Sequence, residues 1–370
     1  SQKKWASYTN FSFSKFGDII MGSYRNHGFE TWGLDYHFLN PNIYNASSIS
    51  NPNPNLQKNT SYDQFDFLQK FNFKISETSN LVLNFQNSKS SDISRYDKLN
   101  ELKNGNYKYS EWKYGPQKRT MVSSLFNFSK KKNFSDKRKL LFAYQNIEES
   151  RHSRRFQELK RLNQIESLDV FSINFDLFKN NSNNSSWAYG FEYVHNNVFS
   201  RAYLQNLNLD QFSELIEASI SYNAPTRYPN EEGYYRAIAS YYEFRKDLSK
   251  RLNVNLGMRY TKTQLRAKWS DREIIQSGLN DVSSKNSSLT SSIGLVYKTL
   301  SNWKINANFS SGFRSPNIDD IGKIREKSGI LTVPNPNLEP EYAYNSEIGI
   351  SKYSNDKLNG FSLNTYYTHI

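Results

Sequence analysis

Residues 64–75 read QFDFLQKFNFKI, and this stretch decides the fold class. Its apolar side chains recur at alternate positions, at Phe65, Phe67, Phe71, Phe73 and Ile75. The positions between them are polar, with one leucine as the exception. A period of two places successive side chains on opposite faces of a β-strand. The stretch therefore predicts a strand with one apolar face and one polar face.

The same alternation returns along the whole chain, for example over residues 171–177, 252–260 and 303–309. It predicts about fourteen strands, which start near residues 4, 18, 62, 80, 118, 137, 167, 186, 232, 251, 286, 302, 341 and 360. Short turns are expected at 14–17, 76–79, 247–250, 299–302 and 354–359. Long connections are expected at 27–61, 91–117, 150–166, 199–231, 266–285 and 314–340.

Short and long connections that alternate between strands of about ten residues are typical of a transmembrane β-barrel, with short periplasmic turns and long extracellular loops. The sequence therefore predicts an all-β fold, an antiparallel transmembrane barrel whose polar face lines a wet interior. Trp5, Trp187 and Trp303 fall at predicted strand starts, where an aromatic girdle would meet the periplasmic interface.

The composition agrees with a folded all-β protein. Aromatic residues make up 15% of the 370 residues, although the mean hydropathy is only −0.79. Disordered segments are poor in aromatic residues, and no stretch reaches the roughly 20 apolar residues of a membrane helix. The chain contains no cysteine, which excludes disulfides and thiolate metal sites.

The formal net charge of +13 indicates a basic surface. Nucleic acid is not expected as a partner, because the basic residues are scattered. One dense cluster is interpreted as a solvated turn, and it comprises Lys130, Lys131, Lys132, Lys137, Arg138 and Lys139. Anionic chelates and lipopolysaccharide phosphates both remain open as partners for the positive charge.

Catalytic motifs are absent from the sequence, so the chain is not expected to be an enzyme and no cofactor is implied. The five histidines show no helical metal-ligand spacing, and no metal site is predicted. Asp319 and Asp320 are adjacent carboxylates that either bind a cation or decorate a loop.

Two sequence boxes carry a family resemblance. GFRSPNIDDIGKI begins at Gly312 and VPNPNLEPEYAYNSEIGI begins at Val333. These segments resemble the F-R-A-P-like and N-P-x-L-x-P-E boxes of TonB-dependent receptors. The matching residues are Phe313, Arg314, Ser315 and Pro316, then Asn335, Pro336, Asn337, Leu338, Glu339, Pro340 and Glu341. Residues 61–71 and 90–119 are also similar to that family.

The resemblance is greatest to the haem and haemoglobin receptors of the family. Those receptors carry a histidine ligand between the two boxes, whereas residues 317–334 contain no histidine. The family barrel has about 22 strands around a plug. Residues 1–370 are therefore expected to be a partial barrel domain, with the plug, its TonB box and about eight strands lying outside this chain.

The resemblance implies a receptor in the outer membrane of a Gram-negative bacterium, among outer-membrane lipids. It implies import of a scarce metal chelate, with an iron-siderophore or haem-carrying ligand ahead of cobalamin. Energy would come from the TonB-ExbB-ExbD complex through the missing N-terminal part. Two alternatives remain open: a complete fourteen-stranded passive channel or porin for small or lipid-like solutes, and a soluble all-β binding module.

Candidate substrate contacts follow from aromatic character and position in the long connections. They are Arg314, Trp32, Tyr36, Tyr96, Trp112 and Tyr114. Arg314 has a second interpretation, because it can pair with loop carboxylates. Pro316 and Pro336 lack a backbone donor, so they are expected to end strands or stiffen loops.

Overall fold

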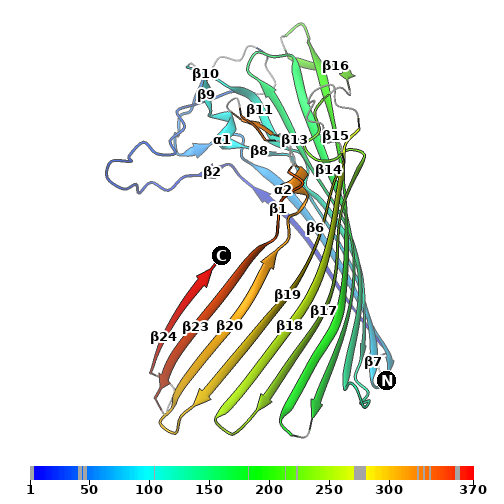
Figure 1. The fold of residues 1–370 in the computed structure, drawn as a ribbon. Helices are drawn as coiled ribbons and strands as arrows, with labels where there is room; N and C mark the ends of the chain where they lie inside the picture. The colour runs from blue at the N-terminus through cyan, green and yellow to red at the C-terminus, as the bar shows by residue number, and fades with distance from the viewer. Residues whose placement is uncertain are drawn as a thin grey trace.

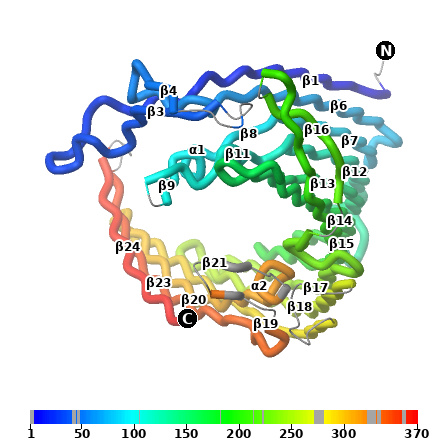
Figure 2. Tube along the Cα trace, turned by 90° about the horizontal axis from the view of Figure 1, so that it is seen from above, coloured from blue at the N-terminus to red at the C-terminus, as the bar shows by residue number. Residues whose placement is uncertain are grey.

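The computed structural model describes residues 4–370 except 41–43, 45–47, 104, 182, 213, 222–223, 271–280, 323–324, 328–329, 333–334 and 355–358. Its long strands form one curved antiparallel sheet around an open central space (Figures 1 and 2). The strands, in their order in the sheet, are β1 (Trp5–Phe16), β6 (Tyr62–Ser76), β7 (Ser79–Ser90), β12 (Lys118–Phe128), β13 (Lys137–Arg155), β14 (Lys160–Asn181), β15 (Ser185–Leu209), β17 (Glu232–Asp247), β18 (Leu252–Lys268), β19 (Asp281–Lys298), β20 (Trp303–Arg314), β23 (Glu341–Tyr353) and β24 (Gly360–His369).

Each of these strands pairs with the next one along the chain, and no ladder joins β1 to β24 in the part that the structure describes. The short turns gather at one end of the sheet and the long connections at the other (Figure 1). This arrangement confirms the prediction of an all-β antiparallel barrel wall.

The long connections carry short elements of their own. These are β2 (Ile19–Ile20), β3 (His37–Phe38), β4 (Ile49–Ser50), β5 (Leu56–Gln57), β8 (Ile93–Ser94), α1 (Tyr96–Leu99), β9 (Leu102–Lys103), β10 (Asn106–Tyr107), β11 (Tyr109–Tyr114), β16 (Leu215–Ser221), α2 (Ile318–Gly322), β21 (Arg325–Lys327) and β22 (Ile330–Thr332). Within the described ranges, neither helix is long and apolar enough to span a membrane.

One predicted wall strand, starting near residue 18, is wrong. β1 pairs with β6 from Trp5 opposite Phe73 to Phe16 opposite Tyr62, so residues 17–61 form a single long connection. The two isoleucines of β2 pair with β5 inside that connection. Asp18 closes its base, because one carboxylate oxygen accepts bonds from the backbone N–H groups of residues 60 and 61 at 2.9 and 3.0 Å.

The predicted long loop at 150–166 is also wrong, since β13 and β14 pair as far as Arg154 opposite Arg161. β13, β14 and β15 contain 19, 22 and 25 residues, about twice the 9–11 that cross a bilayer. The surplus residues extend past the neighbouring strands at the long-connection end (Figure 1). Polar residues in this hairpin extension hid its strand pattern.

The two faces of the sheet can be assigned from α2, which lies inside the curve (Figure 2). Ile318 and the fully buried Ile321 of α2 join a cluster with Leu265, Ala267, Trp269 and Val282. Residues with the parity of Leu265 on β18 therefore face the interior. The alternate residues Leu256, Met258 and Tyr260 face outward and are exposed, as a lipid-facing surface requires.

Candidate functional site

The first sequence box forms the joint between β20 and α2. Arg314 ends β20, and one of its terminal nitrogens donates to both carboxylate oxygens of Asp320 at 2.7 and 2.9 Å. Asn317 opens the turn, because its side-chain oxygen accepts bonds from the N–H groups of Asp319 and Asp320. Ser315 contacts the interior wall through the Thr263 hydroxyl at 2.9 Å.

The second box closes the same joint from the other side. Glu341 starts β23 directly opposite Arg314 in the ladder, and their side chains lie 3.5 Å apart. The Asn335 N–H donates to the backbone oxygen of Ile321 at 3.2 Å, and Leu338 packs against the α2 cluster. The structure therefore brings the two boxes together, and Arg314 pairs with loop carboxylates as its second interpretation expects.

The joint forms one wall of a cavity of about 630 Å³, which we name the loop-end chamber. Strands β13, β14, β15 and β17 form its other walls, together with the connection before β17. Its charged and phenolic lining residues are Glu149, Glu166, Tyr228, Tyr235, Arg314 and Asp319. Its apolar lining residues are Ile147, Leu168, Val198 and Ile318.

Hydrogen bonds fix several of the polar groups in the loop-end chamber. The Tyr228 hydroxyl donates to Asp319 at 2.6 Å. Burial, with this bond, raises the pKa of Tyr228, which keeps the phenol neutral. Arg151 holds Glu166 at 2.7 Å. The chamber thus offers fixed hydroxyl, carboxylate and guanidinium groups beside apolar surface, an arrangement typical of small-molecule sites.

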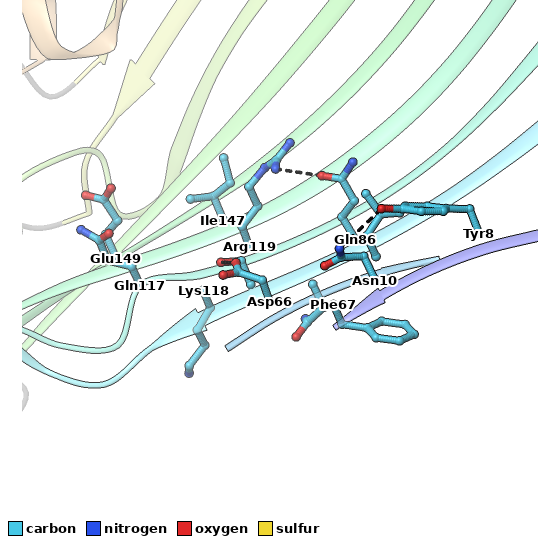
Figure 3. A pocket seen from close by; sticks show the side chains of 13 residues that line it. Tyr8, Asn10, Asp66, Phe67, Gln86, Gln117, Lys118, Arg119, Ile147 and Glu149 are labelled. Atoms are coloured by element: carbon cyan, nitrogen blue, oxygen red, sulfur yellow. Dashed lines mark hydrogen bonds between the residues drawn. The ribbon is translucent and has the colours of Figure 1, made fainter. Parts of the chain in front are cut away.

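A second hollow of about 530 Å³ lies along the interior wall of β1, β6, β7, β12 and β13 (Figure 3). Hydrogen bonds fix the guanidinium group of Arg119 in this hollow, because it donates to Gln86 at 3.3 Å and to Gln145 at 2.8 Å. Ile147 and Glu149 line both this wall hollow and the loop-end chamber. The two cavities are therefore adjacent.

The predicted aromatic contacts do not gather in the loop-end chamber. Tyr96 and Trp112 line a different cavity of about 340 Å³ between the long connections. Tyr114 stacks edge-on against Trp112 with ring centroids 5.2 Å apart. Trp32 and Tyr36 are exposed and line none of these three cavities. Aromatic character alone did not identify a common site.

Glu149, Glu166, Tyr228 and Tyr235 were missed by the sequence interpretation. Strand alternation places Glu166 and Tyr235 on the polar face, but the register that brings them together spans several strands. Among the described residues no group of three or more His, Asp or Glu side chains could hold a metal ion.

Fold and site together define the wall of a transmembrane β-barrel with a ligand-sized chamber at its long-connection end. The chain belongs to the TonB-dependent receptor β-barrel family, because the family model "TonB dependent receptor-like, beta-barrel" matches residues 24–370. No curated protein matches the chain.

Solved structures of similar fold include three outer-membrane proteins. HasR of Serratia marcescens, a hemophore receptor solved as a double mutant with its hemophore HasA and heme, has a TM-score of 0.66 at 10% identity over 100% of this chain and 50% of its own. Fiu, the ferric-catecholate import receptor of E. coli K12, has a TM-score of 0.62 at 10% identity, over 100% of this chain and 54% of its own. The copper transporter OprC has a TM-score of 0.62 at 9% identity, over 82% of this chain and 44% of its own.

At these identities the likeness shows a shared fold alone, and the chain spans about half the length of these structures. Members of the family are Gram-negative outer-membrane receptors and transporters, not enzymes, and this chain belongs in that membrane. The passive-channel alternative receives no support from these comparisons.

Proposed function

We propose that residues 1–370 form a partial barrel domain of an outer-membrane importer for a scarce metal chelate, an iron-siderophore or haem-type compound. The plug and the remaining strands belong to the rest of the protein. The TonB-ExbB-ExbD complex supplies energy for import through that part. The ligand is held in the loop-end chamber before it passes to the periplasm.

The observation that carries the proposal is the loop-end chamber in a member of this family. Its volume of about 630 Å³ falls within the range of about 300–1,000 Å³ that is typical of small-molecule sites. Tyr228 and Tyr235 contribute phenol groups to the lining, where they can contact the oxygen atoms of a chelate. Leu168 and Val198 cover hydrocarbon parts of the same ligand.

The experiment is a thermal-shift titration of the full-length protein with ferric siderophore chelates, haem and cobalamin. A ligand at 100 times its Kd stabilises a protein by about 2.7 kcal/mol. We expect an iron chelate or haem to raise Tm, and we expect the paired change Tyr228→Phe and Tyr235→Phe to reduce that rise. If none of these compounds changes Tm, the substrate class is wrong.

Tyr189→Phe is the matched control, because Tyr189 makes a comparable bond, to the backbone oxygen of Phe134 at 2.6 Å, at the opposite end of the sheet. This variant is expected to keep the full ligand-induced rise in Tm. Uptake of the bound chelate by cells should also stop when TonB is deleted. Uptake that continues without TonB would favour passive conduction.

A further inference from the structure

The positive charge of the chain is concentrated at the short-turn end of the sheet. We define the short-turn rim as the described turn residues between β6–β7, β12–β13, β14–β15, β17–β18, β19–β20 and β23–β24, with four strand residues on either side. The rim contains 15 basic residues: Lys74, Lys130, Lys131, Lys132, Lys137, Arg138, Lys139, Lys179, Arg245, Lys246, Lys250, Arg251, Lys298, Lys304 and Lys352. Its 3 acidic residues are Glu77, Asp136 and Asp247.

The excess of 12 positive charges on the short-turn rim accounts for nearly all of the net charge of +13. The rest of the chain, including the long connections, is therefore close to neutral. Three of the rim cations form ion pairs with described residues, namely Lys74, Lys179 and Arg245. Most of the positive charge at this end is not neutralised within the described chain.

Strand alternation divides the rim cations between the two faces of the wall. Arg138, Lys179, Lys246 and Lys352 share parity with outward apolar residues, whereas Lys137, Lys139, Lys298 and Lys304 have interior parity. The lysines and arginines of the turns lie at the edge between these faces. The outward cations lie on the face of the wall that contacts the surrounding membrane.

Three of the outward cations lie beside the aromatic end of the lipid-facing surface. Lys352 Nζ is 5.0 Å from the ring centroid of Trp303, and Arg138 Cζ is 5.7 Å from that of Phe128. Lys179 is the ladder partner of Trp187. Aromatic rings at a barrel rim mark the membrane interface. The outward cations therefore lie at the depth of lipid headgroups.

We propose that the short-turn rim binds the phosphodiester headgroups of anionic phospholipids in the periplasmic leaflet, with phosphatidylglycerol as the model lipid. Lysine and arginine donate charge-assisted hydrogen bonds to phosphate oxygens. Neighbouring aromatic rings cover the upper acyl chain and glycerol. The rim thereby selects the lipids around the barrel and fixes its depth in the membrane, independently of the imported ligand.

The test uses tryptophan quenching in the full-length protein, reconstituted in phosphatidylcholine bilayers that contain either brominated phosphatidylglycerol or brominated phosphatidylcholine. Trp5, Trp187 and Trp303 report from the short-turn end. A basic residue near an anionic surface contributes about 1 kcal/mol, which corresponds to roughly fivefold preference. We expect about that preference for the anionic lipid at low salt, and its loss at 1 M salt, where the Debye length is about 3 Å.

The variant Arg138→Gln, Lys246→Gln, Lys352→Gln should lose the preference. A control variant that removes the same number of charges from the interior face, Lys139→Gln, Lys298→Gln, Lys304→Gln, should keep most of it. Equal quenching by the two lipids in the wild type overturns the proposal, as does equal loss in both variants. If the first variant does not fold, the wild-type salt titration decides, because a preference that survives 1 M salt is not electrostatic.

Discussion

Replacing Ile321 with alanine tests whether buried apolar packing holds α2 on the barrel wall and so forms the loop-end chamber. The Ile321 side chain is 0% exposed and packs in the cluster with Leu265 and Trp269. Truncation of a buried isoleucine to alanine costs about 2–5 kcal/mol. Since about 1.4 kcal/mol is a factor of ten, opening of α2 should become roughly 30- to 4,000-fold more frequent.

Hydrogen exchange of the full-length protein measures this opening in peptides that cover residues 315–322. The Ile321 amide donates to the Asn317 oxygen at 3.0 Å, so its protection reports the closed state of α2. Ile330→Ala is the matched control, because Ile330 is 72% exposed in the same connection, and this change should alter exchange less than threefold. Equal exchange in the two variants would refute a packing role for Ile321.

Glu111→Gln should destabilise the long connections by about 3–5 kcal/mol, because it removes a carboxylate 3.9 Å from the fully buried guanidinium of Arg154. Faster limited proteolysis of that region will detect the loss of stability. Acid should loosen the connection around Glu101, because Lys108 and Lys98, 2.6 and 2.8 Å from its carboxylate, lower its pKa from 4.5 to about 2. The stabilisation from these ion pairs is present above pH 4.5 and disappears as the pH falls through about 2, which hydrogen exchange measured against pH will follow. Gly190→Ala should lower Tm, because an added Cβ would lie 2.4 Å from the backbone oxygen of Phe175 and 2.5 Å from the Tyr241 hydroxyl. An unchanged Tm would refute this steric clash.

The strands of the barrel wall could be predicted because a period of two repeats in each of them. Residues 64–75 are the clearest case, and they lie within β6. The failure at residue 18 has a physical cause, because two adjacent isoleucines can pair within a loop as well as in a wall. The failure at 150–166 has another cause, since the residues that this hairpin extension buries, such as Arg154 and Asn163, are polar, and the apolar alternation is therefore lost.

The candidate site could be predicted only in part, because its residues come from separate strands. Arg314 was identified from the first box, and the structure places it at the loop-end chamber. Glu149 and Glu166 face each other across a β13–β14 ladder whose register does not follow from either strand alone. Tyr228 precedes β17, and its contact with Asp319 joins residues 91 positions apart.

The contacts of the two sequence boxes stabilise the fold and do not select the ligand. Arg314 uses its guanidinium on Asp320 and Glu341, and the second box supplies a backbone bond and Leu338 to the α2 cluster. Any ligand that fits the loop-end chamber is compatible with this joint. Substrate choice must therefore depend on the surrounding strands, and changing Tyr235 should alter which chelate binds, whereas breaking the Arg314 joint should weaken binding of every chelate alike.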